Sequence, residues 1–131
     1  MNQRQRPLSP FLSAYAWQYT FFNPSVIHRA TGIALAFGLT ALCYFFISIA
    51  RGSDAYSRAL TVFGHPLFKL FLVAWFWSFF FHFLNGIRHL SWDAGYGFEK
   101  QFARASGRMV IATATMLTVA CCLFVFQHYR S

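Results

Sequence analysis

Long apolar runs separated by short polar segments dominate this sequence. Three of them carry charged residues only near their ends, over about 27–50, 67–90 and 107–128. A hydrocarbon core of about 30 Å requires roughly 20 helical residues, and each run is about this long. Because backbone polar groups in lipid must be satisfied within the segment, the pattern predicts three transmembrane helices.

The composition supports the same class of protein. Of the 131 residues, 57% are hydrophobic and 11% are charged. Soluble domains contain about 25% charged residues, so this chain lacks the polar side chains to cover a soluble globule. We therefore expect an all-α integral membrane protein in contact with membrane lipid, folded as a single membrane-anchor domain over residues 1–131.

The segment before the first span has a helix start signal of its own. Ser9 followed by Pro10 is typical of an N-cap and a first helical position, and aromatic residues suited to the membrane interface follow. The sequence thus predicts a short N-terminal interfacial helix. Asn23 and Pro24 repeat the signal and place the start of the first span. No cleavable signal peptide is apparent in the polar N-terminus.

The positive charges predict the orientation, because short cytoplasmic loops are enriched in Lys and Arg. Seven cations on one side oppose four on the other: Arg4, Arg6, Arg29, Arg88, Lys100, Arg104 and Arg108 against Arg51, Arg58, Lys69 and Arg130. We expect the N-terminus and the second loop to be cytoplasmic. The net charge of +8 sits at segment ends without a nucleic-acid-type basic run, so no nucleic-acid partner is expected.

His82 is the main candidate functional residue, because it is an imidazole deep within an apolar run. An ionisable side chain at the centre of a bilayer costs about 2.5–3.5 kcal/mol for Arg, Lys or Asp, and such residues usually bind or move something. His89 lies two turns further on the same side, and Gly86 between them lets a flat macrocycle or a helix approach.

This face of the second span fits a b-type haem, with its propionates near cations at the membrane edge. The candidates for that edge are Arg88, Arg29, His28 and His89. The residues alone equally allow a different interpretation, in which His82 is only hydrogen-bonded to a neighbouring helix.

Ser25 and Arg29 are four residues apart and share a helix face, with His28 on an adjoining face. A hydroxyl and a guanidinium at the membrane boundary can hydrogen-bond a carbonyl or a carboxylate. A structural interpretation is also open, in which Ser25 is an extra capping group and Arg29 is a snorkelling anchor.

In their order along the chain, these residues resemble the cytochrome b556 membrane-anchor subunits of succinate dehydrogenase, respiratory complex II. The similarity comprises Arg6–Pro10, Ser25–Gly32, and His82 followed by Gly86–Leu90 and Asp93. It covers nearly the whole chain. Each motif alone is weak, but their ordered combination is specific.

The resemblance implies a subunit of succinate dehydrogenase (quinone) that does not itself bind succinate, in the respiratory chain and the tricarboxylic acid cycle. Such subunits pair with a second small membrane-anchor subunit and hold one haem b between them. They tether the flavoprotein subunit and the iron-sulfur subunit, and electron transport ends on ubiquinone.

The resemblance also implies residue roles. His82 matches the axial ligand of the haem iron, which makes it the metal-binding residue. Ser25 and Arg29 match positions of the ubiquinone site, and His28 with Arg29 lies in the haem propionate environment. His89 is a further propionate neighbour. Since the chain offers one deep histidine, the partner anchor subunit is expected to supply the other haem ligand.

Asp93 matches a structural or proton-relay position of the family. Without an evident targeting extension, a bacterial inner membrane is favoured over a mitochondrial one. Two rival hypotheses remain. One is the anchor of a fumarate reductase, which shares this architecture, and the other is a cofactor-free membrane scaffold.

Overall fold

The structure is a computed structural model, and it describes residues 24–130 as four helices joined by short turns. They are α2 (Pro24–Ala50), α3 (Ser53–Gly64), α4 (Pro66–Asp93) and α5 (Lys100–Arg130). Within this described part of the chain every regular element is a helix, which confirms the all-α prediction. The interfacial helix predicted to open at Ser9 lies outside the described residues.

α2, α4 and α5 are each long and apolar enough to cross a membrane. Their apolar segments are Pro24–Ala50, Pro66–Asp93 and Gln101–His128. This confirms the three predicted membrane-crossing helices. The helices extend past the predicted spans at most ends, and α5 begins at Lys100 because its polar first turns are helical as well.

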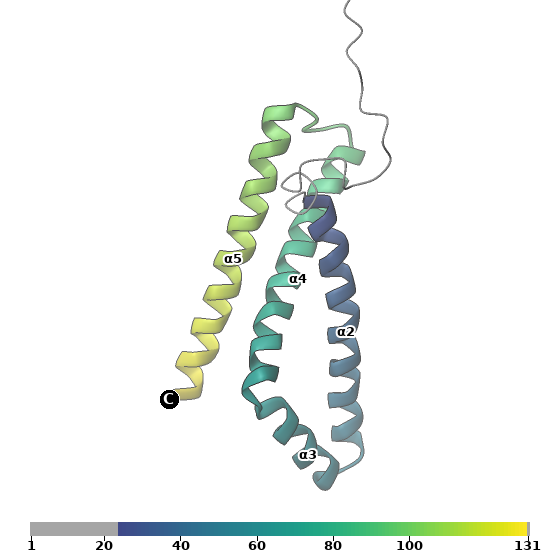
Figure 1. The fold of residues 1–131 in the computed structure, drawn as a ribbon, viewed down its shortest axis with the longest axis vertical. Coiled ribbons are helices and arrows are strands. Elements are labelled where there is room, and N and C mark those ends of the chain that lie inside the picture. The colour runs from purple at the N-terminus through teal and green to yellow at the C-terminus, as the bar shows by residue number, and fades with distance from the viewer. Residues whose placement is uncertain (1–23, 131) are drawn as a thin grey trace, which may run out of the picture.

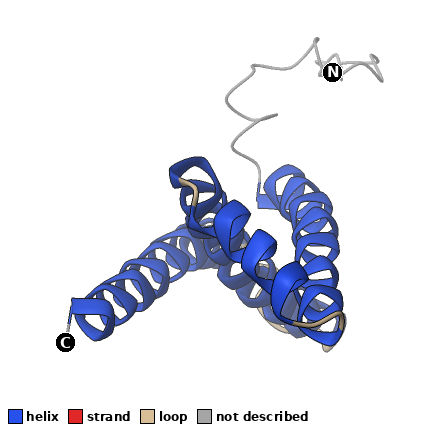
Figure 2. Cartoon of the chain, turned by 90° about the horizontal axis from the view of Figure 1, so that it is seen from below, coloured by secondary structure: helices blue, strands red, loops and turns tan. Residues whose placement is uncertain are grey.

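α4 is the middle helix of the fold (Figure 1). It packs against α2 on one side and α5 on the other, and it runs in the opposite direction to both. α3 lies at the turn between α2 and α4, at the end of the molecule away from the start of α2. The view from below shows α2 and α5 on different sides of the central helices (Figure 2). The start of α2, the end of α4 and the start of α5 therefore share one end of the molecule.

The turns around α3 follow from Gly52 and Pro66. Gly52 has a φ of 96°, in the left-handed region that favours glycine, and this turns the chain out of α2. Pro66 holds the preceding His65 extended, with a ψ of 137°, and this ends α3. The Nδ1 of His65 accepts the backbone N–H of Leu67 at 3.3 Å, so His65 also caps α4.

The sequence analysis did not predict α3. Its signal was present in Ala55, Ala59 and Phe63, which recur every fourth residue and point inward while the residues around them are exposed. A twelve-residue helix is too short to cross a membrane, so a search for apolar spans passes over it.

A small core joins the three long helices. Phe81 of α4 and Ala114 of α5 are fully buried, and Val110 is nearly so. Five half-buried apolar residues pack against them: Ile27, Trp77, Phe80, Leu84 and Ile111. Because Ile27 belongs to the first turns of α2, this core lies toward the end of the molecule where α2 begins.

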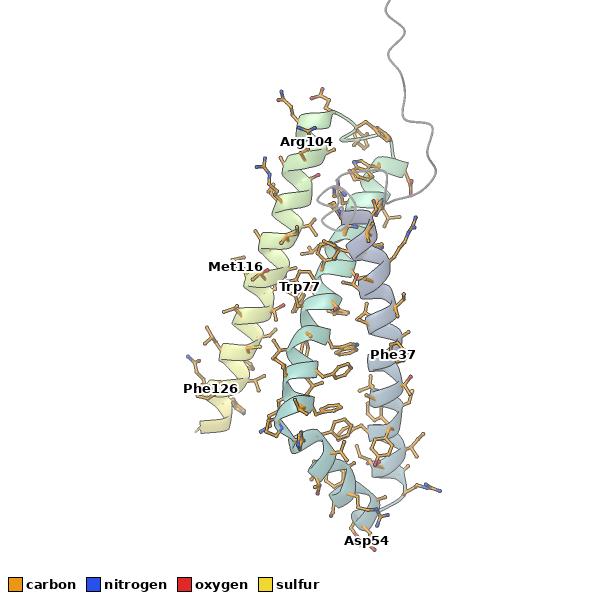
Figure 3. All side chains as sticks on the ribbon, in the orientation of Figure 1. Phe37, Asp54, Trp77, Arg104, Met116 and Phe126 are labelled. Atoms are coloured by element: carbon orange, nitrogen blue, oxygen red, sulfur yellow. The ribbon has the colours of Figure 1, made fainter. Side chains whose placement is uncertain are left out.

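Most apolar side chains of the long helices point outward instead. Phe37 lies on α2, and Met116 and Phe126 lie on α5 (Figure 3); their exposed fractions are 68%, 64% and 57%. Of each span's most apolar window, only 11%, 11% and 17% is buried within the chain. Such a surface suits lipid or other apolar helices rather than water.

α2 and α4 pack closely where Gly38 faces Trp75. Gly38 is buried, and a Cβ atom at this position would overlap the Trp75 indole ring. The indole N–H makes a long hydrogen bond of 3.5 Å to the carbonyl of Leu35. The contact thus depends on the missing side chain at Gly38.

Replacing Gly38 with Ala is expected to destabilise the packing of α2 on α4. Overpacking costs about 1–3 kcal/mol, which exceeds the ~0.5–1 kcal/mol that alanine gains over glycine within a helix. Thermal unfolding of the purified protein in detergent measures the change. Gly64→Ala is the control, because a Cβ atom there meets nothing within 4 Å. Equal stability of the two variants would contradict the prediction.

Candidate functional site

Three of the histidines singled out in the sequence lie together between α2 and α4. The rings of His28 and His82 are stacked, with centroids 3.8 Å apart and planes 11° apart. The ring of His89 tilts against His28 at 5.5 Å and meets Trp92 edge-on at 5.1 Å. His82 and His89 thus face the same neighbour from α4, as their spacing predicted. We call His28, His82 and His89 the histidine cluster.

The hydrogen bonds of His82 tie it to α2. Its Nδ1 lies 3.1 Å from the carbonyl oxygen of His28 and 3.2 Å from the hydroxyl of Thr31. The Thr31 hydroxyl in turn donates to the His28 carbonyl at 2.9 Å. The alternative of a histidine bonded to a neighbouring helix is therefore realised, but at Nδ1 alone. Within residues 24–130, no hydrogen bond that we find for His82 uses Nε2.

This bonding pattern fits a haem ligand. Metal-binding histidines almost always donate their second ring N–H to a carbonyl or carboxylate, which orients the ring and raises its basicity. Gly86, one turn along α4 from His82, has no atom within 4 Å of the place where a Cβ would lie. The chain therefore combines an oriented imidazole with open space on the helix that carries it.

The stacking of His28 on His82 limits how these two rings could bind one metal ion. Two histidines that held one metal ion from opposite sides would have to point a ring nitrogen toward each other. The rings of His28 and His82 lie face to face instead, so His28 cannot be the ligand opposite His82 in this arrangement. In the described part of the chain, no group of three or more His, Cys, Asp or Glu is placed to hold a metal ion.

The cluster lies at the end of the molecule where α2 begins. His82 is 11 residues before the last residue of α4, which is about 16 Å along the helix axis at 1.5 Å per residue. His28 lies in the second turn of α2 and is half-buried. Its Nδ1 is buried and has no hydrogen-bond partner among residues 24–130. A polar group arriving there would satisfy this atom.

Ser25 and Arg29 lie at the same end of the molecule, in the first two turns of α2. Ser25 is half-buried in the first turn of α2, and Arg29 is exposed one turn later. Within the described residues, we find neither a hydrogen bond nor a ring contact between Arg29 and the histidine cluster. The structure thus brings together His28, His82 and His89 and leaves Arg29 exposed on α2. Asp93 is exposed at the last position of α4.

Arg88 takes a position that the sequence did not predict. Instead of extending to the membrane edge, its guanidinium reaches α5, where Nε donates to the Ser106 hydroxyl at 2.9 Å and Nη2 to the Ala103 carbonyl at 2.9 Å. Nη1 donates to Asn85 Oδ1 at 3.2 Å, and the charge lies 3.9 Å from the centre of a Trp92 ring. Arg88 is therefore a tie between α4 and α5.

One part of this tie, the contact between Asn85 and Arg88, could have been predicted from their spacing in the sequence. Asn85 and Arg88 are three residues apart and so share a helix face. Gly107 follows Ser106, and a Cβ atom there would lie 3.2 Å from Pro24 Cγ and 3.8 Å from Arg88 Nη2. The missing side chain lets α5 approach both α2 and α4. Asn85 is fully buried, and its Nδ2 has no partner within residues 24–130.

Arg88→Met is expected to loosen α5 from α4. The change keeps the apolar stem but removes three hydrogen bonds, and those made by charged groups are worth about 1.5–3 kcal/mol each at most. Arg88→Lys should not restore the thermal stability, since an ammonium group lacks the planar set of N–H donors with which the guanidinium bonds several acceptors at once. Thermal unfolding in detergent is the measurement. Arg104→Met, at an exposed position of α5, is the control. Equal loss in both methionine variants would contradict the tie.

Comparison with known proteins shows the family of the chain. Residues 2–121 match the family described as succinate dehydrogenase/fumarate reductase transmembrane subunit. The chain is 36% identical over 115 residues to the succinate dehydrogenase cytochrome b556 subunit of Rickettsia felis, covering 88% of this chain and 89% of that protein. It is 32% identical over 126 residues to the subunit of the same name from Paracoccus denitrificans, covering 96% of each.

A third relative has a related name. The succinate dehydrogenase cytochrome b560 subunit of Cyanidium caldarium is 32% identical over 131 residues, covering 96% of this chain and 98% of that protein. These matches confirm the resemblance inferred from the ordered motifs. The chain belongs to the succinate dehydrogenase/fumarate reductase transmembrane subunit family.

Proposed function

We propose that this protein is the membrane-anchor subunit of a succinate:ubiquinone oxidoreductase. In this role it holds haem b together with a second anchor subunit, helps to form the site of ubiquinone reduction, and tethers the flavoprotein and iron-sulfur subunits to the membrane. The names of its relatives support the assignment to a cytochrome b subunit. The observation that carries it is the orientation of His82 by α2.

His82 is the proposed ligand of the haem iron. Its Nδ1 is occupied by the Thr31 hydroxyl and the His28 carbonyl, which leaves Nε2 for the metal. When bound, the haem supplies a centre that accepts and returns one electron. His28 and His89 lie beside His82 and can receive the propionates, and the buried, unpartnered Nδ1 of His28 is suited to this contact.

A second anchor subunit completes the proposed haem site. Because His28 stacks on His82 rather than opposing it, a second ligand to the haem would come from the partner subunit. The outward apolar side chains of α2, α4 and α5 can pack against apolar helices of that subunit as well as against lipid.

Ser25 and Arg29 are the proposed ubiquinone residues of this chain. They lie one turn apart at the start of α2, at the same end as the histidine cluster. The Ser25 hydroxyl can donate a hydrogen bond to a quinone oxygen. The Arg29 guanidinium is exposed and always charged, so it can stabilise negative charge that develops on that oxygen during reduction.

The proposed orientation has the N-terminus in the cytoplasm of a bacterium, with the chain in the inner membrane. The fold collects Arg29, Arg104 and Arg108 at the end where α2 begins, whereas Arg51 and Arg58 lie at the end with α3. This bias supports a cytoplasmic location for the first end. The flavoprotein and iron-sulfur subunits then dock on that side, next to Ser25 and Arg29.

One rival function has a specific observation in its favour. The hydrogen bond between His82 and the His28 carbonyl would also serve a membrane scaffold without a cofactor. The family description includes fumarate reductase as well, but the relatives named above are succinate dehydrogenase subunits.

His82→Ala is expected to remove the low-spin b-type absorption band of the purified complex. The variant lacks the imidazole nitrogen, and alanine offers no replacement ligand. A reduced-minus-oxidised spectrum is the measurement, and His128→Ala, at an exposed position near the end of α5, is the control. An unchanged band in His82→Ala would remove this residue from the haem site. Absence of haem from the intact wild-type complex would favour the scaffold.

Arg29→Leu and Ser25→Ala are expected to impair quinone reduction. Loss of a preorganised charge at a developing oxyanion costs about 10²-fold in turnover, and loss of one hydrogen bond costs about tenfold. Succinate oxidation by an artificial acceptor should stay at the wild-type rate, because that chemistry takes place in another subunit. Arg58→Leu, an exposed cation on α3, is the control. Wild-type quinone turnover in Arg29→Leu would contradict the proposed role.

A further inference from the structure

Thr31 lies between His28 and His82 and is almost completely buried, with 4% of its surface exposed. We propose that Thr31 is a positioning residue that, together with the backbone carbonyl of His28, fixes the proton of His82 on Nδ1 and thereby presents Nε2 to the iron. The inference rests on the proposed haem ligation by His82. It adds a residue that acts through the ligand rather than on the haem.

A count of donors and acceptors gives the location of the proton. The Thr31 hydroxyl has one hydrogen, and this hydrogen is used in the bond to the His28 carbonyl at 2.9 Å. The hydroxyl oxygen and the carbonyl oxygen are then both acceptors toward His82 Nδ1, at 3.2 and 3.1 Å. Only a protonated Nδ1 satisfies them. A neutral imidazole has one N–H, so its lone pair is on Nε2.

The opposite tautomer conflicts with the backbone. If the Thr31 hydroxyl turned its hydrogen toward an unprotonated Nδ1, the carbonyl oxygen of His28 would face the nitrogen lone pair at 3.1 Å. A carbonyl cannot donate a hydrogen bond, so this contact would be repulsive. The hydrogen bond from the Thr31 hydroxyl to the His28 carbonyl would also be lost.

The residue after Thr31 restricts the same ring. A Cβ atom at Gly32 would lie 3.1 Å from His82 Cε1 and 3.7 Å from Nδ1, so the backbone of α2 passes close to this edge of the imidazole. The ring of His28 covers one face at 3.8 Å. Two consecutive residues of α2, Thr31 and Gly32, therefore orient a side chain of α4.

The proposed role predicts the direction in which the haem midpoint potential changes when Thr31 is replaced. Acceptors on the Nδ1–H of a ligating histidine raise its basicity and so favour the oxidised iron. Thr31→Val keeps the shape of the side chain but removes one of the two acceptors. The haem midpoint potential should rise, and haem should transfer to excess apomyoglobin about tenfold faster, at the low end of the ~10–100-fold effects of such outer contacts.

The experiment uses the whole complex, purified with wild-type Thr31, Thr31→Val or Thr31→Ser. Thr31→Ser retains the hydroxyl and should restore the wild-type potential and transfer rate. Thr40→Val is the matched control, because Thr40 is on the same helix, is exposed, and donates to the Ala36 carbonyl. If the Thr31→Val complex does not assemble, Thr31→Ala is measured in the same way, since it only removes atoms.

The outcomes separate this inference from the function on which it rests. A raised potential in Thr31→Val, with wild-type values in Thr31→Ser and Thr40→Val, supports it. A wild-type potential and transfer rate in Thr31→Val would overturn it and leave haem ligation by His82 intact. An equal shift in Thr31→Ser or Thr40→Val would overturn it too, because packing would then explain the change. A complex whose b-type band survives His82→Ala refutes the proposed ligation itself.

Discussion

The hydrogen bond between His82 Nδ1 and the backbone of α2 is the interaction on which the rest of this structure depends. A polar ring at this depth must find its partner within the protein, because lipid offers none. The ring of His82 finds this partner in the carbonyl oxygen of His28. This hydrogen bond requires α2 and α4 to approach closely at Gly32. The same bond decides which ring nitrogen stays available. Helix packing and the chemistry of the candidate site thus have a common origin.

Much of the fold could be predicted, because the length of an apolar run is a local property of a sequence. The three long helices follow from it, and the start of α2 at Pro24 follows from the Asn23–Pro24 start signal. α3 was missed because it is amphipathic and only 12 residues long, so a search for runs long enough to cross a membrane does not find it. Arg88 could not be placed, since a cation near the end of a span looks the same in sequence whether it reaches water or Ser106.

The candidate site was predictable within each helix but not between helices. The seven-residue spacing of His82 and His89 determines that they share a face of α4. The stacking of His28 on His82 depends on how α2 is rotated against α4, which periodicity does not determine. The proposed role of Thr31 has no signal in the sequence, because it depends on a backbone carbonyl from its own helix and a ring from another.

The outward-facing apolar surface affects the stability of this protein when it is not assembled with its partner subunits. A chain that buries only 11% to 17% of its spans gains little stability from its own interior, and partner binding supplies the remainder by mass action. Copies that are not bound to a partner subunit are therefore expected to unfold most readily and to be degraded by membrane proteases. On the proposed function, the amount of this polypeptide in the membrane is therefore expected to follow the amount of its partner subunits.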